Sequence, residues 1–322
     1  MNINLVENIE LVHGAAEVCA GEDGFSLARM TEELLTFYSF SEAQEIRASC
    51  PSGVRICFNS NTSFVAMRIS YGRLARAIFA VELVVDGTEV LTFAPETPEN
   101  GLTFTTELPA GGERRIEIFL PHLCECQVNE LIIEDGATLT PVKYPGKRII
   151  FIGDSITQGM TSSSPLKSYT SRLAAKLDWD FHNISVGGAI MKQEVGRMAE
   201  KIKWDLAILA YGVNDFAQSR PLDEFIADTV GMLRYLCQRK KSVVWLITPI
   251  PCPAVPPVNT QGLKIDDYRK ALTDAATEFD NVRVVDGTEL VPDDKKYFDD
   301  DGVHPNDLGM ASYADVMFKK MS

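Results

Sequence analysis

Residues 147–159 read KRIIFIGDSITQG. Four apolar residues, 149–152, are followed at once by a glycine, an aspartate and a serine. A short apolar run that is rich in isoleucine is typical of a strand buried on both faces of a parallel sheet, and Gly-Asp marks the turn after it. The stretch therefore predicts a strand over 147–153 with Ser155 at its carboxyl end.

The same alternation of strand and helix continues to the end of the chain. Further buried strands are expected at 181–187, 205–212, 242–250 and 282–287. Segments with helical spacing of apolar residues lie at 166–177, 189–203, 222–240, 263–279 and 306–321. Repeated strand-helix units of this kind predict an α/β domain whose parallel five-stranded sheet is covered by helices on both faces.

The first 142 residues have a different pattern. Short runs rich in Val, Ile, Phe and Thr are separated by Gly, Pro, Asn and Asp, at 52–60, 62–72, 79–90, 102–108, 114–121 and 128–136. Runs of this kind without helical segments between them predict an antiparallel β-sandwich of jelly-roll-like type. The stretch TPVKYPG at 140–146 is typical of a linker, so we expect domains at 1–142 and 143–322.

Composition limits the classes of partner and compartment. The 322 residues have a formal net charge of −14, which argues against nucleic acid and anionic membranes as partners. Seven scattered cysteines do not form a disulfide framework, and neither a signal peptide nor a membrane span is recognisable, so we expect a cytoplasmic protein. No zinc-type spacing is present and no cofactor or metal is expected, although the acidic stretch at 293–301 leaves calcium as an alternative.

Residues suited to acyl transfer follow the predicted strands. Because ligands bind beyond the carboxyl ends of strands in such sheets, Ser155, Asn214 in GVND at 212–215 and His304 in DGVHP at 301–305 are expected at one edge. Serine needs a base to become nucleophilic, and histidine is the usual one. Asp301 lies three residues before His304 and is the preferred carboxylate partner.

Two details of this candidate site stay open. Asp299 and Asp300 compete with Asp301 for the acidic role. Backbone N–H groups and an amide side chain could stabilise an oxyanion, and either Gly187 or Gly188 could supply one of the N–H groups.

The four blocks GDSITQG, NISVGG, GVND and DGVHP resemble, in order and setting, those of the SGNH hydrolases, also called GDSL esterases and lipases. The resemblance covers about the last 180 residues and implies a three-layer α/β/α sandwich with a flavodoxin-like sheet. It also implies a nucleophile and first oxyanion donor at Ser155, further donors at Gly188 and Asn214, and a triad completed by Asp301 and His304. A β-sandwich ahead of such a domain is similar to the layout of carbohydrate esterase family 2.

These observations predict a serine esterase that hydrolyses carboxylic esters of small acyl groups, with carbohydrate O-deacetylation as one form of that activity. The alternatives are a short-chain lipase or acylhydrolase and a carbohydrate-binding protein that has lost turnover. An α/β-hydrolase elbow does not fit, since Thr157 stands where Gly-x-Ser-x-Gly requires its last glycine. The expected partner is a small-molecule or carbohydrate ester, and the oligomeric state is left open.

Overall fold

In a computed structural model, the protein divides into two compact units. The structure describes residues 1–109, 111–239 and 242–322. The first unit is Met1–Pro145 with Ser164–Leu166, and the second is Gly146–Ser163 with Lys167–Ser322. The domain limits expected from the sequence, 1–142 and 143–322, stay a prediction.

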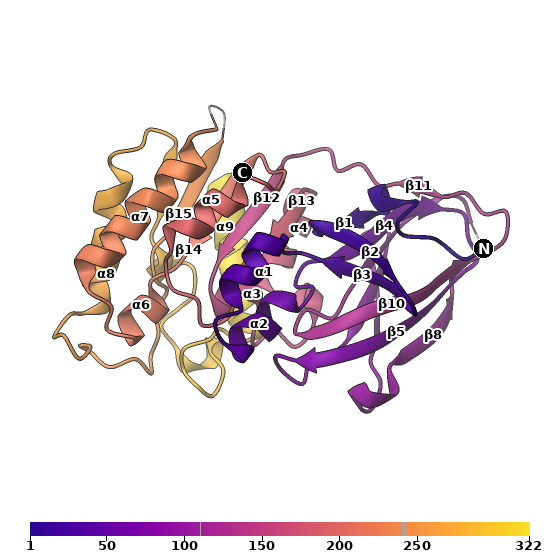
Figure 1. Ribbon diagram of the computed structural model, residues 1–322, viewed down its shortest axis with the longest axis horizontal. Coiled ribbons are helices and arrows are strands. Elements are labelled where there is room, and N and C mark those ends of the chain that lie inside the picture. Colours follow the sequence, from indigo (N-terminus) through magenta and orange to yellow (C-terminus); the bar gives the residue numbers. More distant parts are fainter. Residues whose placement is uncertain (110, 240–241) are drawn as a thin grey trace. The chain divides into compact units, whose positions relative to one another are not determined.

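The first unit is an antiparallel β-sandwich (Figure 1). One sheet has the order β1-β4-β9-β6-β7, with β11 paired to β4, and the other has the order β2-β3-β10-β5-β8. In the first six residues of β5, every second side chain is buried, at Val65, Met67 and Ile69, because successive residues of a strand point to opposite faces. These side chains belong to one apolar core together with Ile116 and Ile118 of β9.

The bounds in the first sheet are β1 (Val12–His13), β4 (Arg55–Ser60), β6 (Val81–Val85), β7 (Glu89–Phe93), β9 (Arg114–Phe119) and β11 (Thr140–Pro141). Those in the second are β2 (Glu17–Gly21), β3 (Gly24–Ala28), β5 (Phe64–Leu74), β8 (Leu102–Glu107) and β10 (Cys124–Ile133). Two helices, α1 (Glu32–Tyr38) and α2 (Glu42–Ser49), follow β3 and are capped by the Thr31 and Ser41 side chains.

The second unit is built on a parallel sheet that, in the described part of the chain, has five strands in the order β13-β12-β14-β15-β16. Their bounds are β12 (Arg148–Gly153), β13 (Asp180–Asn183), β14 (Leu206–Ala210), β15 (Val243–Ile247) and β16 (Val282–Val285). Residues 149–152 of β12 are fully buried, as a central parallel strand requires. Strand β12 pairs with both β13 and β14, so the chain reverses its direction of winding beside β12.

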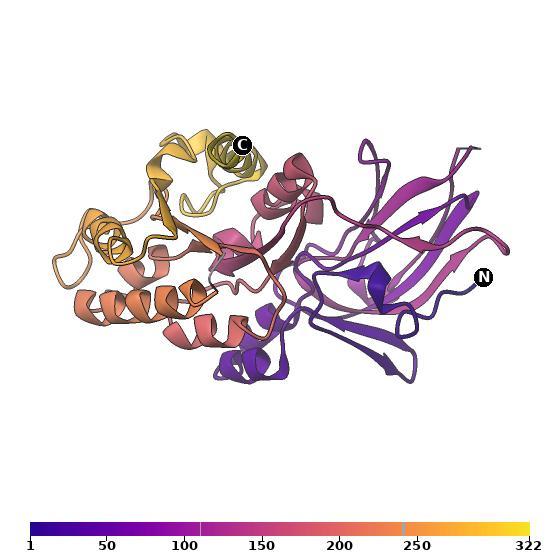
Figure 2. The same cartoon turned by 90° about the horizontal axis from the view of Figure 1, so that it is seen from above.

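Helices cover both faces of this sheet, which confirms the predicted three-layer α/β/α fold (Figure 2). Helices α4 and α9 pack together on one face, and α7 packs against α5 and α8 on the other. The bounds are α3 (Ser155–Gln158), α4 (Tyr169–Leu177), α5 (Gln193–Ala199), α6 (Val213–Ala217), α7 (Leu222–Cys237), α8 (Ile265–Ala276) and α9 (Asp307–Met321). The helix expected over 222–240 ends at Cys237, and residue 240 lies outside the described residues.

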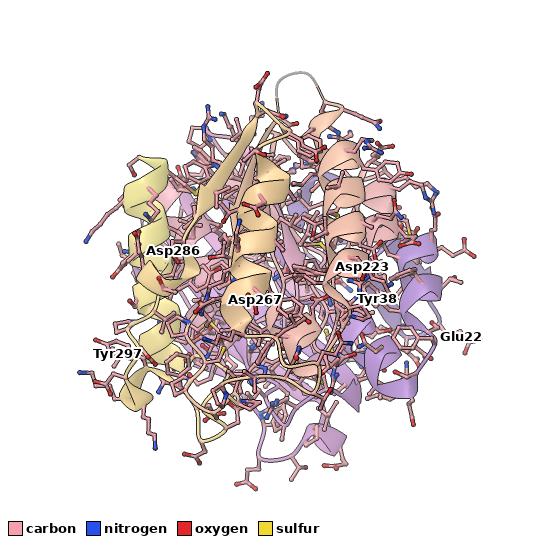
Figure 3. The ribbon with its side chains drawn as sticks, turned by 90° about the vertical axis from the view of Figure 1, so that its left-hand side faces the viewer. Glu22, Tyr38, Asp223, Asp267, Asp286 and Tyr297 are labelled. Atoms are coloured by element: carbon pink, nitrogen blue, oxygen red, sulfur yellow. The ribbon has the colours of Figure 1, made fainter. Side chains whose placement is uncertain are left out.

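Helices α7 and α8 begin at the edge where the strands end. Their first turns contain Asp223 and Asp267, which Figure 3 labels at the same end of the two helices. Acidic residues in a first turn stabilise the helix because they face the positive end of its dipole. Among the described residues, none of the helices has the length and apolar composition that crossing a bilayer requires.

Candidate active site

A sharp turn connects β12 to α3 and places Ser155 at the first position of that helix. The Asp154 side chain caps the helix by accepting a hydrogen bond from the Ile156 N–H at 3.0 Å. A Cβ atom on Gly153 would stand 2.6 Å from the Ala210 carbonyl oxygen, so only glycine fits at the end of the strand. Ser155 is 8% exposed, and its N–H donates to no described protein group.

Three side chains form a continuous hydrogen-bonded series. The Ser155 Oγ lies 2.7 Å from His304 Nε2, and His304 Nδ1 lies 2.6 Å from Asp301 Oδ2. A carboxylate beside Nδ1 favours the tautomer with the proton on Nδ1, which leaves Nε2 free to accept a proton from the hydroxyl. The geometry is that of a nucleophile, its base and the group that orients the base.

The Asp301 carboxylate is held by its own loop. Its Oδ1 accepts hydrogen bonds from the backbone N–H groups of Val303 and His304, each at 2.9 Å. Partial burial by itself raises the pKa of Asp301, but these hydrogen bonds and the contact with the His304 imidazole hold the pKa below its usual value. Asp301 therefore stays ionised beside the imidazole at neutral pH.

Asp299 and Asp300 have other places in the loop. The Asp299 N–H donates to the His304 carbonyl at 2.8 Å, and the Asp299 carbonyl accepts from the Gly302 N–H at 2.9 Å. No described contact joins the carboxylate of Asp299 or Asp300 to the imidazole, whereas that of Asp301 is in contact with it.

The loop after β13 contains Gly187 and Gly188, the two glycines that the sequence leaves as alternative oxyanion donors. The Gly187 N–H donates to the Gln158 Oε1 at 2.7 Å and is therefore occupied. Gly188 has a φ of +80°, a conformation that favours glycine, and its N–H donates to no group among the described residues. Gly188 is thus the better placed of the two to donate to a bound substrate.

Asn214 lies in the first turn of α6, directly after β14. One N–H of its amide donates to the Ala189 carbonyl at 2.9 Å, and the second N–H of the same amide is left over. Gly212, with a φ of +115°, forms the turn that starts this helix. The hydrogen bond to Ala189 joins the loop of Gly188 to the helix of Asn214, so these two candidate donors lie close to one another.

A second set of contacts ties the histidine loop to the segment after α3, and sequence reasoning missed it. The Thr161 hydroxyl donates to the Pro305 carbonyl at 2.8 Å, and the Ser163 N–H donates to Asp307 Oδ1 at 3.0 Å. The Ser163 hydroxyl also donates to Asp307. The Asn306 side chain caps α9 by accepting from Leu308 and Gly309. These contacts hold the loop of His304 beside the segment that follows Ser155.

No cluster of three or more His, Cys, Asp or Glu side chains in the described part of the chain has a metal-binding arrangement. The acidic stretch at 293–301 is used locally. Asp294 caps a short 3-10 helix at Lys295–Tyr297, and Asp301 contacts His304.

Comparisons with known proteins agree with this architecture. The model of the GDSL-like lipase/acylhydrolase family matches residues 151–311. No curated protein matches the chain.

Several solved structures share the fold over both units. A salicylyl-acyltransferase, SsfX3, from a tetracycline biosynthetic pathway has a TM-score of 0.82 at 21% identity, over 96% of this chain and 93% of that one. A family two carbohydrate esterase from Cellvibrio japonicus has 0.65 at 15%, over 84% and 88%. An acetyl xylan esterase, Est2A, from the rumen bacterium Butyrivibrio proteoclasticus has 0.60 at 13%, over 84% and 88%.

Asp154, directly before the serine, is a buried carboxyl group. Burial, with a smaller contribution from the charge of Asp215, raises the pKa of Asp154 to about 7, and the Ile156 N–H only partly offsets this. An unfolded chain would titrate the same group near pH 4. Between about pH 4 and 7 the folded protein binds more protons here than the unfolded chain, so this group lowers the free energy of unfolding as the pH rises.

We expect Asp154→Asn to remove that dependence while keeping an oxygen that can accept the Ile156 N–H. The free energy of unfolding of the variant, relative to that of the unmodified protein, should be higher at pH 8 than at pH 5 by on the order of 2 kcal/mol. Urea unfolding at the two pH values measures it. The control is Asp286→Asn, at a residue that Figure 3 labels. Asp286 also caps a short helix, at Gly287–Glu289, but the hydrogen bond from the Thr288 N–H lowers its pKa. The expectation would be contradicted if the free energy of unfolding of Asp154→Asn differed from that of the unmodified protein by the same amount at pH 5 and at pH 8.

Proposed function

This chain belongs to the GDSL-like lipase/acylhydrolase family and is a hydrolase of ester bonds, and from this premise we propose that it is a serine esterase acting through Ser155, His304 and Asp301. The observation that supports this assignment is the pair of contacts at 2.7 Å and 2.6 Å that join hydroxyl, imidazole and carboxylate. An ordinary turn serine would not have a histidine, 149 positions away in the chain, beside its oxygen.

In the first half of the reaction, His304 Nε2 takes the proton of the Ser155 hydroxyl while Oγ bonds to the acyl carbon. The electron pair of the carbonyl moves onto its oxygen. Asp301 remains ionised and stabilises the imidazolium that forms. The bond from the acyl carbon to the alcohol oxygen then breaks, and the alcohol leaves with the proton from His304.

In the second half, water attacks the acyl carbon and gives a proton to His304. The bond to Ser155 Oγ breaks, and the serine recovers its proton from the imidazolium. The products are a carboxylic acid and an alcohol, and no redox change occurs.

The oxyanion of each tetrahedral intermediate requires donors aimed at one point. We assign this role to the N–H groups of Ser155 and Gly188 and to the second N–H of the Asn214 amide. The two backbone N–H groups donate to no described protein group, which supports the assignment. The Ser155 N–H also lies at the positive end of a short helix.

For the substrate class we favour small acyl groups, with acetyl groups on carbohydrate hydroxyls first. Two of the structures with the same fold are described as a family two carbohydrate esterase and an acetyl xylan esterase. The structure described as a salicylyl-acyltransferase supports a second candidate, in which an alcohol rather than water receives the acyl group. Both begin with the same acyl-enzyme.

Ser155→Ala should lower kcat for p-nitrophenyl acetate by on the order of 10⁶, because it removes the nucleophile. It should also abolish labelling by a fluorophosphonate probe. Ser162→Ala is the matched control, since Ser162 lies seven residues after Ser155, is fully buried and makes no hydrogen bond to a described residue through its hydroxyl. Full turnover in Ser155→Ala would defeat the assignment, and an unmodified protein that the probe does not label would favour a binding protein that has lost turnover.

Asn214→Ala should lower kcat by about 10²–10³, the usual effect of removing one oxyanion donor. The control is Asn281→Ala, because the Asn281 amide also donates to one backbone carbonyl, that of Ser242 at 3.0 Å, beside the amino end of β16. Steady-state kinetics of the two variants make the comparison. An unchanged kcat in Asn214→Ala would remove this residue from the mechanism.

Substrate preference is tested with p-nitrophenyl esters of increasing chain length, acetylated sugars, and added methanol as an acceptor. We expect kcat/KM to be highest for acetyl esters and to fall with chain length. If kcat/KM instead increased with chain length up to the octanoate ester, the short-chain lipase alternative would be favoured. Methyl ester as the main product at low methanol concentration would favour acyl transfer.

A further inference from the structure

A buried ion pair lies beside the candidate site, and the proposed mechanism assigns it no role. Asp215 follows Asn214 in α6 and is 0% exposed, and Arg220 is 6% exposed. Arg220 Nη1 lies 3.0 Å from Asp215 Oδ1. Burying two charges is expensive, and replacing such a pair by apolar residues is often neutral or stabilising. Stability alone therefore does not explain why the pair is here.

The pair holds the peptide groups on both sides of Met191. The Met191 N–H donates to both carboxylate oxygens of Asp215 at 3.2 Å, and the Met191 carbonyl accepts from Arg220 Nη1 at 2.6 Å. Met191 lies three residues after Gly188. The ion pair thus fixes the far end of the loop that presents the Gly188 N–H.

The same ion pair is also connected to Asn214, the second candidate donor. Asp215 is the next residue after Asn214, and the Asn214 amide donates to Ala189 inside the loop. Asp215 is therefore connected to the loop of Gly188 in two ways, through its hydrogen bonds to Met191 and through the hydrogen bond of its neighbour Asn214 to Ala189. Three contacts in turn hold Arg220. Its guanidinium donates to Asp228 of α7 and to the Glu224 carbonyl, the latter at 3.3 Å. Its carbonyl accepts from the Tyr268 hydroxyl.

We propose that the Asp215–Arg220 ion pair positions the Gly188 and Asn214 donors for the oxyanion. The inference rests on the proposed function and adds two positioning residues to it. Donors of this kind must be held to within about 0.5 Å, and a misplacement of 1 Å can lower the rate by about 10². An ion pair with a planar, five-donor guanidinium supplies that directional hold, whereas apolar packing does not.

The expected kinetic signature follows from what the donors contact. The donors stabilise charge that develops only in the transition state, so their displacement should lower kcat and leave KM nearly unchanged. The affinity for a transition-state analogue, such as a trifluoromethyl ketone, should fall by the same factor as kcat/KM. Substitution of a residue that only stabilises the fold would lower the melting temperature without equal losses of kcat/KM and of affinity for the analogue.

A matched control exists at the other end of the same sheet. Arg148 Nε and Asp180 Oδ2 form an ion pair at 2.7 Å, in which the Asp180 side chain is 7% exposed and the Arg148 side chain is 40% exposed. The two residues are the first of β12 and β13, so they lie at the amino ends of the strands. Asp180→Asn removes a buried, arginine-paired carboxylate away from the site.

The experiment compares Asp215→Asn, Arg220→Lys and Asp180→Asn with the unmodified protein, at a temperature well below every melting temperature. We expect kcat to fall about 10–100-fold in the first two, with KM within about twofold and a parallel loss of trifluoromethyl ketone affinity. Asp180→Asn should lower the melting temperature and leave kcat within about twofold. If Asp215→Asn does not fold, Asp228→Asn replaces it, since Asp228 binds Arg220 from the other side and its loss should give a smaller decrease in kcat.

Two results would overturn this inference but not the proposed function. In the first, turnover depends on Ser155 but kcat is unchanged in folded Asp215→Asn and Arg220→Lys. In the second, Asp180→Asn loses as much kcat as those two variants. Turnover that survives Ser155→Ala would instead overturn the proposed function, and with it this inference.

Discussion

The candidate site depends on one contact, that between the Ser155 hydroxyl and the His304 imidazole at 2.7 Å. The two residues are 149 positions apart, so the distance has to be set by the fold. β12 ends two residues before Ser155, and the contacts of Thr161 and Ser163 with residues 305 and 307 return the histidine loop to the same place. A displacement of about 1 Å at this contact would remove the advantage of a preformed base.

The parallel sheet makes that convergence possible. Parallel strands with helical crossovers bring all their carboxyl ends to one edge, and the beginnings of the following helices lie there too. β12 lies between β13 and β14, so the loops after these three strands become neighbours. The serine, the glycines and the asparagine each follow one of them. The apolar interior of the strands provides rigidity, and the loops are free to differ in chemistry.

Much of this was predictable from the residues, because burial on both faces leaves a strong pattern. The five strands of the second unit and the longer helices between them were expected within a few positions, as was the sandwich ahead of them, whereas the short helices α3 and α6 were not expected. The pattern failed where strands are short or exposed: β1 has two residues, and β2 exposes four of its five, so neither has the expected alternation. Helix α2 was missed because its mean hydropathy is low and its apolar face is weak. The hydrogen bonds of Gln158, Thr161 and Ser163 join distant loops, and no local periodicity encodes them.

Gly188 shows how backbone hydrogen bonding can point to a candidate donor. In the loop from residue 184 to 191, three N–H groups donate to backbone carbonyls and three to side chains, namely Asn183, Gln158 and Asp215. Of the N–H groups in this loop, only those of Gly188 and Ile190 have no acceptor among the described residues. Both residues are half-buried, so these N–H groups can reach solvent or a bound molecule, whereas a fully buried N–H without a partner would cost about 1–3 kcal/mol. Asn183, Gln158 and Asp215 occupy neighbouring N–H groups, so the Gly188 N–H is one of two in the loop that remain available to the oxyanion that we propose.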